Sequence, residues 1–485
     1  MTTITLSLVS HTNAGKTTLA RTLLGADVGE VRDAPHVTEF ASMHTLIETP
    51  AGDSLRLWDT PGFGDSARLV RRLRASGNPL GWLLSQVWDR WRDRAFWASQ
   101  QALRHVQQDS DVLLYLVNAA ERPGAAGYVE PEMDLLAWVG KPVLVLLNQM
   151  GAPRSVADEA QDLEIWRLHL VRWPGVCAVL PLDAFARCWV HELTLMRAVT
   201  AALTQAQDSE RASAMARLAD AWQARREATF SAALQTLAAS LARTAVAREP
   251  VQGDSGWAER LRRLGAALGQ GPATDADPAA AAQARLAAAL AAEVRANTAQ
   301  LLALHGLQGS ASSEIISRVA HQFAHHERVP EGRAAVLGGA LAGALTGLKA
   351  DILSGGLTLG GGLLAGGLLG ALGAAGVARG INVVRGTGQS WVAWRDDALD
   401  GAAHAALLRY LAVAHFGRGR GDWSPGEAPA HWPPAVALAL ARQRAEWTAA
   451  WARRSQRLDG ADDTAALAAA LQPLLEQAAR EVLAA

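Results

Sequence analysis

Cysteine is nearly absent from this chain of 485 residues, which contains only Cys177 and Cys188. Two cysteines are too few for a disulfide-stapled secreted scaffold or a four-thiolate metal site. An excess of charge is also missing, since 46 Lys and Arg residues face 47 Asp and Glu residues. A net charge of -1 provides no electrostatic footprint for nucleic acid. We therefore expect a protein of a reducing cytosol without a nucleic-acid partner.

Lysine is scarce as well, because every basic residue except Lys16, Lys141 and Lys349 is an arginine. A compact ammonium group at position 16 differs chemically from a guanidinium group. The first ten residues lack the basic start and the cleavage site of a signal peptide, and they alternate like a strand. Half of the residues are apolar and 19% are charged, so we expect large folded cores and no wholesale disorder.

Short runs of Leu, Val and Ile alternate with helical patterns in the first part of the chain. The strand-like runs lie at 3–9, 54–59, 111–118, 142–148 and 176–182. The helical patterns lie at 16–24, 66–107 and 131–139. This alternation predicts an α/β domain with a mostly parallel sheet and helices on both faces.

The rest of the chain is predicted to be mainly α-helical. No Gly or Pro occurs from 196 to 248, and Asp277-Pro278 resembles the start of a helix over 279–303. Within 331–385 charged residues become rare and glycine becomes frequent. The predicted divisions are the α/β domain 1–205, a helical domain 206–330, a glycine-rich apolar hairpin 331–385 and a C-terminal helical region 386–485.

The octad Ser10-His-Thr-Asn-Ala-Gly-Lys-Thr17 stands between the first strand and the first helix, which is the context of a phosphate-binding P-loop. Backbone N–H groups of such a loop surround a polyphosphate, Lys16 reaches its β and γ oxygens, and Thr17 binds Mg²⁺. Ser10 replaces the first glycine of the motif. The alternative is an ordinary turn that contains Gly-Lys. The predicted nucleotide-binding residues here are Asn13, Ala14, Gly15, Lys16, Thr17 and Thr18.

A second motif, Asp59-Thr-Pro-Gly62, ends the strand at 54–59 and so lies at the same edge of the sheet. Asp59 would hold Mg²⁺ through water, and the N–H of Gly62 would contact the γ-phosphate. An isolated β-turn is the alternative. Thr38 would close over the nucleotide and ligate Mg²⁺, unless it is a solvated loop residue, and Thr45 is its rival. The predicted catalytic residues are thus Lys16, Thr38 and Gly62, and the predicted metal ligands are Thr17, Thr38 and Asp59.

Over about residues 1–205 the chain resembles the P-loop GTPases of the Era/TrmE-like group. Asn13-Ala-Gly-Lys-Thr17, Thr38, Asp59-Thr-Pro-Gly62 and Asn148 at the end of a strand carry the resemblance. More loosely, the chain resembles bacterial proteins that join such a domain to an uncharacterised helical, glycine-rich C-terminal half. The resemblance implies GTP and Mg²⁺ as cofactors, with K⁺ held by Asn13.

The base-recognition motif departs from the pattern of this group. The group carries Asn-Lys-x-Asp, whereas Asn148 is followed by Gln-Met-Gly151 here, so the carboxylate that selects guanine is absent. We expect guanine preference to be relaxed. Ala184 would offer its N–H to the base, and Asp183 either replaces the missing carboxylate or caps a helix. Phe63 stands where some of these GTPases place glutamine, which predicts slow intrinsic turnover.

The segment 66–107 is predicted to be a helical insertion that follows the γ-phosphate-sensing loop. It carries Trp82, Trp88, Trp91 and Trp97 among residues at helical spacing. An amphipathic aromatic helix would result. Its tryptophans either form an exposed aromatic face or pack against the helical half of the chain.

Two uncharged stretches, 334–348 and 352–378, are separated only by the segment that contains Lys349 and Asp351. Glycine recurs at every fourth position in each, which allows close packing of two helices. The sequence predicts a hairpin in the inner membrane, with the rest of the chain facing the cytoplasm. A packed soluble hairpin or a re-entrant segment is the alternative.

Together these features predict a GTP-binding protein, associated with membrane lipid, that hydrolyses GTP to GDP and phosphate as a conformational switch. A second copy of the chain, an activating protein or K⁺ would accelerate turnover. A nucleotide-binding scaffold without turnover and a triphosphatase with relaxed base specificity remain as alternatives.

Overall fold

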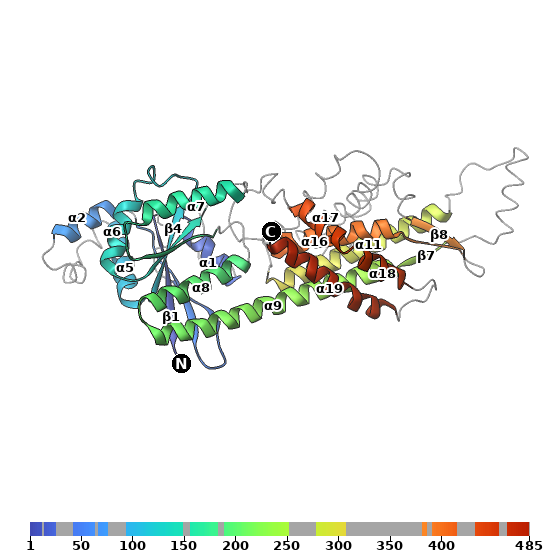
Figure 1. Ribbon diagram of the computed structural model, residues 1–485, viewed down its shortest axis with the longest axis horizontal. Helices are drawn as coiled ribbons and strands as arrows, with labels where there is room; N and C mark the ends of the chain where they lie inside the picture. The colour runs from blue at the N-terminus through green and yellow to red at the C-terminus, as the bar shows by residue number, and fades with distance from the viewer. Residues whose placement is uncertain are drawn as a thin grey trace, which may run out of the picture. The chain divides into compact units, whose positions relative to one another are not determined.

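The computed structural model describes residues 1–11, 14–25, 42–63, 66–75, 94–148, 156–182, 189–251, 278–306, 381–385, 390–414, 432–454 and 463–484. The chain divides into two compact units (Figure 1). The first comprises Met1–Ala228 and Ala414–Glu427, and the second comprises Thr229–Val413 and Ala428–Ala485. The sheet that carries the predicted motifs belongs to the first unit.

The first unit is built on a six-stranded sheet with the order β2-β3-β1-β4-β5-β6. The strands are β1 (Thr3–Ser10), β2 (Ser42–Glu48), β3 (Ser54–Asp59), β4 (Val112–Asn118), β5 (Val143–Asn148) and β6 (Val176–Pro181). Strand β2 pairs antiparallel with β3, and the other pairings are parallel. Apolar side chains fill β4 and β5 almost without interruption because both faces of these strands are covered.

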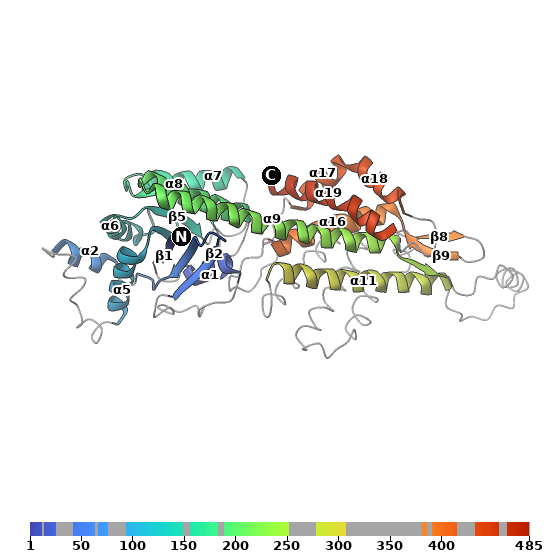
Figure 2. The ribbon, with the colours of Figure 1, turned by 90° about the horizontal axis from the view of Figure 1, so that it is seen from below.

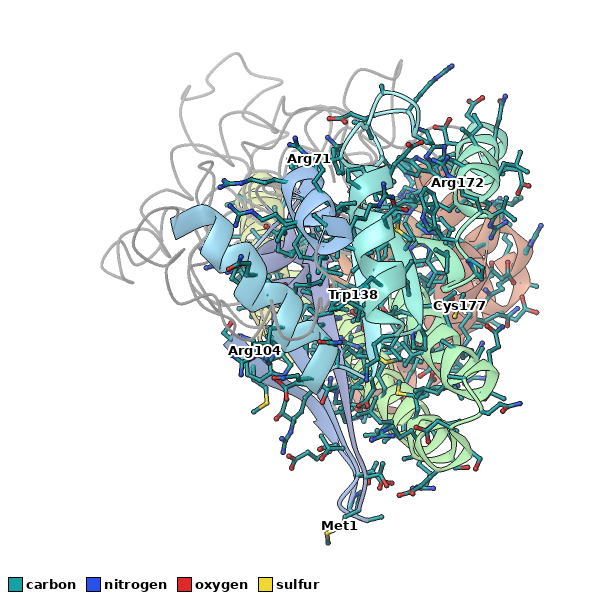
Figure 3. The ribbon with its side chains drawn as sticks, turned by 90° about the vertical axis from the view of Figure 1, so that its left-hand side faces the viewer. Met1, Arg71, Arg104, Trp138, Arg172 and Cys177 are labelled. Carbon is teal, nitrogen blue, oxygen red and sulfur yellow. The ribbon has the colours of Figure 1, made fainter. Side chains whose placement is uncertain are left out.

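Helices cover both faces of this sheet. One face packs against α1 (Lys16–Leu24), α8 (Trp189–Gln205) and the N-terminal part of α9 (Ser209–Val246). The other face packs against α2 (Ser66–Ala75), α5 (Arg94–Asp109), α6 (Val129–Val139) and α7 (Val156–Leu170). Figure 3 looks onto α2, α5 and α6. The predicted α/β P-loop fold is confirmed.

The second unit is mainly helical, as predicted. Its helices are the C-terminal part of α9, α11 (Pro278–Leu304), α16 (Asp396–Ala414), α17 (Trp432–Arg442), α18 (Arg444–Ala452) and α19 (Asp463–Ala484). Figure 2 shows α9, α11 and α16 side by side. A small sheet with the order β7-β9-β8 was not predicted, and it consists of β7 (Arg248–Pro250), β8 (Ile381–Arg385) and β9 (Ser390–Trp394).

The predicted apolar hairpin at 334–378 lies outside the described residues, and β8 forms the last part of the range 331–385. Within the described ranges, no helix combines the length and the apolar character needed to cross a membrane. Helices α2 and α5 are the described parts of the predicted insertion 66–107, while Trp82, Trp88 and Trp91 lie outside them. The domain boundaries remain a prediction.

Candidate functional site

The turn between β1 and α1 has the backbone shape that a phosphate-binding loop needs. Gly15 is the N-cap of α1 and adopts a left-handed conformation with φ 88°, which favours a residue without a Cβ atom. Its carbonyl accepts the first helical hydrogen bond, from the N–H of Leu19, at 2.9 Å. The helix therefore begins at Lys16, directly behind the glycine, and its N-terminus faces the loop.

Lys16 lies inside this loop with only 7% of its surface exposed. Its Nζ donates to the hydroxyl of Ser10 at 2.9 Å, and that hydroxyl donates to the carbonyl of His11 at 2.6 Å. Burial lowers the pKa of the Lys16 ammonium group, and the nearby carboxylates of Asp59 and Glu132 oppose this shift. The ammonium group is thus held in the hollow of the loop by a hydroxyl that the usual first glycine would not supply.

Asp59 and Thr17 meet at the other side of the loop. The Thr17 hydroxyl donates to Oδ2 of Asp59 at 2.5 Å, and Asp59 is 2% exposed. Burial raises the pKa of the Asp59 carboxyl group. Its Oδ1 is buried and has no hydrogen-bond partner in the part of the chain that the structure describes. A hard cation, which takes oxygen ligands, would bind to the Thr17 hydroxyl and the Asp59 carboxylate, so these residues fit Mg²⁺.

The segment after Asp59 runs alongside the P-loop. The N–H of Phe63 donates to the carbonyl of Ser10 at 2.9 Å, and the Thr60 hydroxyl donates to the carbonyl of Leu8 at 2.6 Å. These bonds place Gly62 beside the loop, where it is buried. The Phe63 side chain is 1% exposed and packs in the core shared by α2 and α5. It is therefore directed into the protein interior.

Asn148 connects the end of β5 to the P-loop. Its Nδ2 donates to the carbonyl of Ala14 at 2.8 Å, and the side chain is fully buried. Thr18 is 5% exposed on α1. The structure therefore brings Ala14, Gly15, Lys16, Thr17, Thr18, Asp59, Gly62 and Asn148 to one edge of the sheet, formed by the carboxyl ends of the parallel strands.

Comparison with known proteins finds a family model that this region matches. Residues 5–149 match the family model described as a 50S ribosome-binding GTPase. This part of the first unit is therefore similar to P-loop GTPase domains. No relative was found among curated protein sequences. The match covers the strands β1 to β5 and all of the motifs up to Asn148.

Solved structures that resemble the chain include several GTPases. A variant of Era from Aquifex aeolicus bound to GDP and AlF4⁻ is 17% identical, with a TM-score of 0.27, over 44% of this chain and 57% of that chain. Era in complex with MgGDPNP and a segment of 16S ribosomal RNA is 18% identical over the same shares, with a TM-score of 0.27. A dimerisation-deficient variant of Toc33 from Arabidopsis thaliana is 15% identical, with a TM-score of 0.25, over 38% of this chain and 71% of that chain. The chain thus spans little more than half of the length of the Era structures.

Several predicted residues of the GTPase domain lie outside the described residues, namely Asn13, Thr38, Gly151, Asp183 and Ala184. Thr45, the rival of Thr38, is described. It is exposed on β2 opposite Arg56, whereas Ser42 is the residue opposite Asp59. Three residues of a strand span about 10 Å, so Thr45 lies away from the Asp59 carboxylate.

One functional candidate of the GTPase domain was not predicted. Glu132 on α6 is fully buried, and burial raises the pKa of its carboxyl group. One of its oxygens lies 2.9 Å from Nδ1 of His11 in the P-loop, and the other accepts the Tyr115 hydroxyl at 2.9 Å. A signal was present in the sequence, because Glu132 lies on the apolar side of α6, with Val129, Met133 and Leu136.

Proposed function

We propose that this protein binds GTP and hydrolyses it to GDP and phosphate as a conformational switch. The observation that carries the proposal is the pairing of Thr17 with the buried Asp59 carboxylate, next to the Lys16 ammonium group. A buried carboxylate with an unpartnered oxygen is costly in a fold unless a ligand completes it. A magnesium nucleotide is such a ligand.

The reaction is attack of water on the γ-phosphorus, with the bond to the β-γ bridging oxygen breaking. Lys16 would contact the β and γ oxygens, and the N–H of Gly62 would contact the γ-phosphate. Thr17 and Asp59 would hold Mg²⁺, with Thr38 as a further candidate ligand; when bound, the ion neutralises phosphate charge. These groups position the triphosphate and neutralise its charge, so catalysis requires little acid–base chemistry from the chain.

Intrinsic turnover is proposed to be slow. Phe63 follows the Gly62 segment directly, and its ring lies in the core, so it does not orient a water molecule. Acceleration would come from a second copy of the chain, from an activating protein, or from K⁺ held with the help of Asn13. Equal rates of GTP hydrolysis in Na⁺ and in K⁺ would exclude acceleration by K⁺.

A triphosphatase with relaxed base preference is the second candidate. Asn148 commits an amide hydrogen to the carbonyl of Ala14, and Gly151 stands where related GTPases carry a base-binding carboxylate. A site without that buried acceptor loses the penalty that rejects the wrong base. Ala184 would contribute only its backbone N–H to base binding.

Membrane association is proposed from the sequence of 334–378. The uncharged stretch 352–378 is long enough for a hydrocarbon core of about 30 Å, and the rest of the chain would then face the cytoplasm. Flotation of the full chain with liposomes tests this proposal. Recovery of monodisperse protein in the detergent-free supernatant would contradict it.

The function is tested by measuring GTP and ATP binding and hydrolysis for the purified full chain and for Lys16→Ala. We expect Lys16→Ala to lose nucleotide binding and turnover. Lys141→Ala is the matched control, because Lys141 precedes β5 and belongs to no phosphate-binding motif. Binding without turnover would select a nucleotide-binding scaffold, and equal use of both nucleotides would select the relaxed triphosphatase.

A further inference from the structure

A buried carboxylate lies beside the P-loop but outside the motifs that define it. Glu132 is fully buried on α6, and each of its carboxylate oxygens has a partner. Tyr115 reaches it from β4, the strand next to β1, and His11 reaches it from the P-loop. A buried charge persists in a fold only when it is paired in this way. The position of Glu132 therefore links α6, β4 and the P-loop.

The imidazole of His11 is held on two sides. Its Nδ1 lies 2.9 Å from the carboxylate of Glu132. Its ring stacks on the ring of Tyr128, with the centroids 4.7 Å apart and the planes 19° apart. An imidazole that is fixed both at its edge and on its face has little rotational freedom, so it transmits the position of α6 to the backbone of the loop.

The backbone of His11 is also the point where the P-loop meets the segment that contains Gly62. His11 is the second residue of the P-loop octad, and it pairs with Phe63 in a parallel bridge. The adjacent Ser10 carbonyl accepts the N–H of Phe63. The residue before Phe63 is Gly62, whose N–H is proposed to sense the γ-phosphate. A displacement of His11 would therefore shift the P-loop and the Gly62 segment relative to each other.

We propose that Glu132 is a positioning residue for nucleotide turnover, which acts through His11 to hold the first limb of the P-loop in register with the Gly62 segment. The inference rests on the proposed GTPase function. It assigns Glu132 no contact with the nucleotide. A shift of about 1 Å between reacting groups can cost on the order of 100-fold in rate, so a buried anchor at this junction affects chemistry more than binding.

The test compares the full chain with Glu132→Gln, which keeps the size of the side chain and removes its charge. Glu192→Gln is the matched control, because Glu192 is a carboxylate of the same unit that is 1% exposed and accepts bonds from Trp222 and Arg226. We expect both variants to unfold at lower temperature. Only Glu132→Gln should lose turnover, with kcat falling about 10- to 100-fold and KM changing less than about 3-fold.

His11→Ala keeps the proposal testable if Glu132→Gln does not fold. The imidazole is 33% exposed, so its removal leaves no closed cavity. We expect His11→Ala to show the same loss of kcat. The kcat of the double variant should fall no further than that of the more impaired single variant, because both residues act through one contact. A folded Glu132→Gln protein with unchanged kcat, or additive losses in the double variant, would overturn the inference.

Failure of the GTPase function is recognised separately. If the unaltered chain binds GTP but turns over no faster than Lys16→Ala, hydrolysis is excluded. The positioning role, which concerns turnover, then fails as well, whereas an unchanged kcat in a folded Glu132→Gln protein overturns the positioning role alone. If the unaltered chain binds no nucleotide, both proposals fail.

Discussion

The ammonium nitrogen of Lys16 lies 2.9 Å from the hydroxyl oxygen of Ser10, so the first and seventh residues of the P-loop octad are joined by a hydrogen bond. A glycine at position 10 would offer no side chain for this contact. The buried ammonium group thus has a partner of its own within the loop. The Ser10 hydroxyl occupies one of the three N–H donors of the Lys16 ammonium group, so a phosphate that uses this donor displaces the hydroxyl.

Replacing Ser10 by alanine is therefore predicted to tighten nucleotide binding. A hydrogen bond that involves a charged group contributes about 1.5–3 kcal/mol net, which corresponds to a decrease in Kd of about 10- to 150-fold. Titration calorimetry with magnesium GTP measures the change. Ser213→Ala is the control, since Ser213 is an exposed serine on α9 that donates to the carbonyl of Ser209. Weaker binding by Ser10→Ala would show that the hydroxyl serves the nucleotide instead.

Asp59→Asn is predicted to separate folding from magnesium binding. Burial raises the pKa of the Asp59 carboxyl group even though Thr17 and Lys16 lie nearby, so burial of the charged carboxylate costs the ligand-free fold stability. The variant should unfold at the same or a higher temperature than the unaltered protein without ligand. It should also lose the added stability that magnesium GTP gives, because the metal ligand is gone. Scanning calorimetry with and without magnesium GTP measures both effects.

The outcome that contradicts this prediction is a ligand-free Asp59→Asn protein that unfolds at a lower temperature. The Asp59 carboxylate would then stabilise the fold as a counter-charge for Lys16. Thr60→Ser is a suitable control, because it keeps the hydroxyl that bonds to the Leu8 carbonyl and lies next to Asp59.

The fold of the GTPase domain was largely predictable because its central strands are uninterrupted apolar runs. The run 111–118 corresponds to β4, Val112–Asn118, and 142–148 corresponds to β5, Val143–Asn148. Strand β2 was missed because it lies at the edge of the sheet and only two of its residues, Leu46 and Ile47, are buried, so it contains no long apolar run. The strands β7, β8 and β9 were missed because each has five residues or fewer, and β7 pairs with β9 across a long stretch of sequence.

The site was predictable only where a motif fixes it. Lys16, Thr17 and Asp59 follow strands at characteristic spacings, so their meeting at one edge of the sheet follows from topology. Glu132 belongs to no such motif. Its contact with His11 depends on how α6 packs against the sheet, and periodicity alone does not give that packing. The contact of Ser10 with Lys16 was likewise not predicted, because the motif has glycine at this position and so specifies no side chain there.

The pH dependence of stability is predicted from Asp53, at the turn between β2 and β3. Asp53 accepts the N–H of Thr2 at 2.9 Å and the Nε of Arg217, on α9, at 2.8 Å. The Thr2 amide, followed by the Arg217 guanidinium group, lowers the pKa of the Asp53 carboxyl group. A lowered pKa in the fold means that the charged group stabilises above the unfolded value of about 3.9 and that this share is lost as pH falls through the folded value.

Asp53→Asn should therefore melt at a lower temperature than the unaltered protein at pH 7. The difference should shrink as pH falls below about 4 and should be absent once Asp53 is protonated in the fold. Melting followed by circular dichroism over this range measures it. Asp220→Asn, an exposed acid on the same helix, serves as the control. A difference that stays constant with pH would show that Asp53 contributes through neutral hydrogen bonding alone.

The last prediction concerns a buried guanidinium group in the second unit. Arg409 on α16 is 3% exposed, and its Nη2 donates to Oδ1 of Asn297 on α11 at 2.8 Å. Nδ2 of Asn297 in turn donates to the carbonyl of Thr236 on α9 at 3.0 Å. Burial lowers the pKa of Arg409 to about 10, and the charge of Glu293 opposes this shift. Nε of Arg409 has no hydrogen-bond partner among the described residues.

This arrangement predicts that replacing Asn297 and replacing Arg409 lower the free energy of unfolding by different amounts. Asn297→Leu leaves a buried charge without its acceptor and should cost more than about 3 kcal/mol of unfolding free energy. Arg409→Met removes the charge, leaves only a neutral amide oxygen unpaired and should cost about 1–3 kcal/mol. The double variant should be more stable than Asn297→Leu alone, because the unpaired charge is gone. Urea unfolding followed by tryptophan fluorescence, to which the buried Trp447 and Trp451 of this unit contribute, measures all three variants. If Arg409→Met instead costs more unfolding free energy than Asn297→Leu, the guanidinium group stabilises the helices through its packing, and an unpaired charge is not the main source of the lost stability.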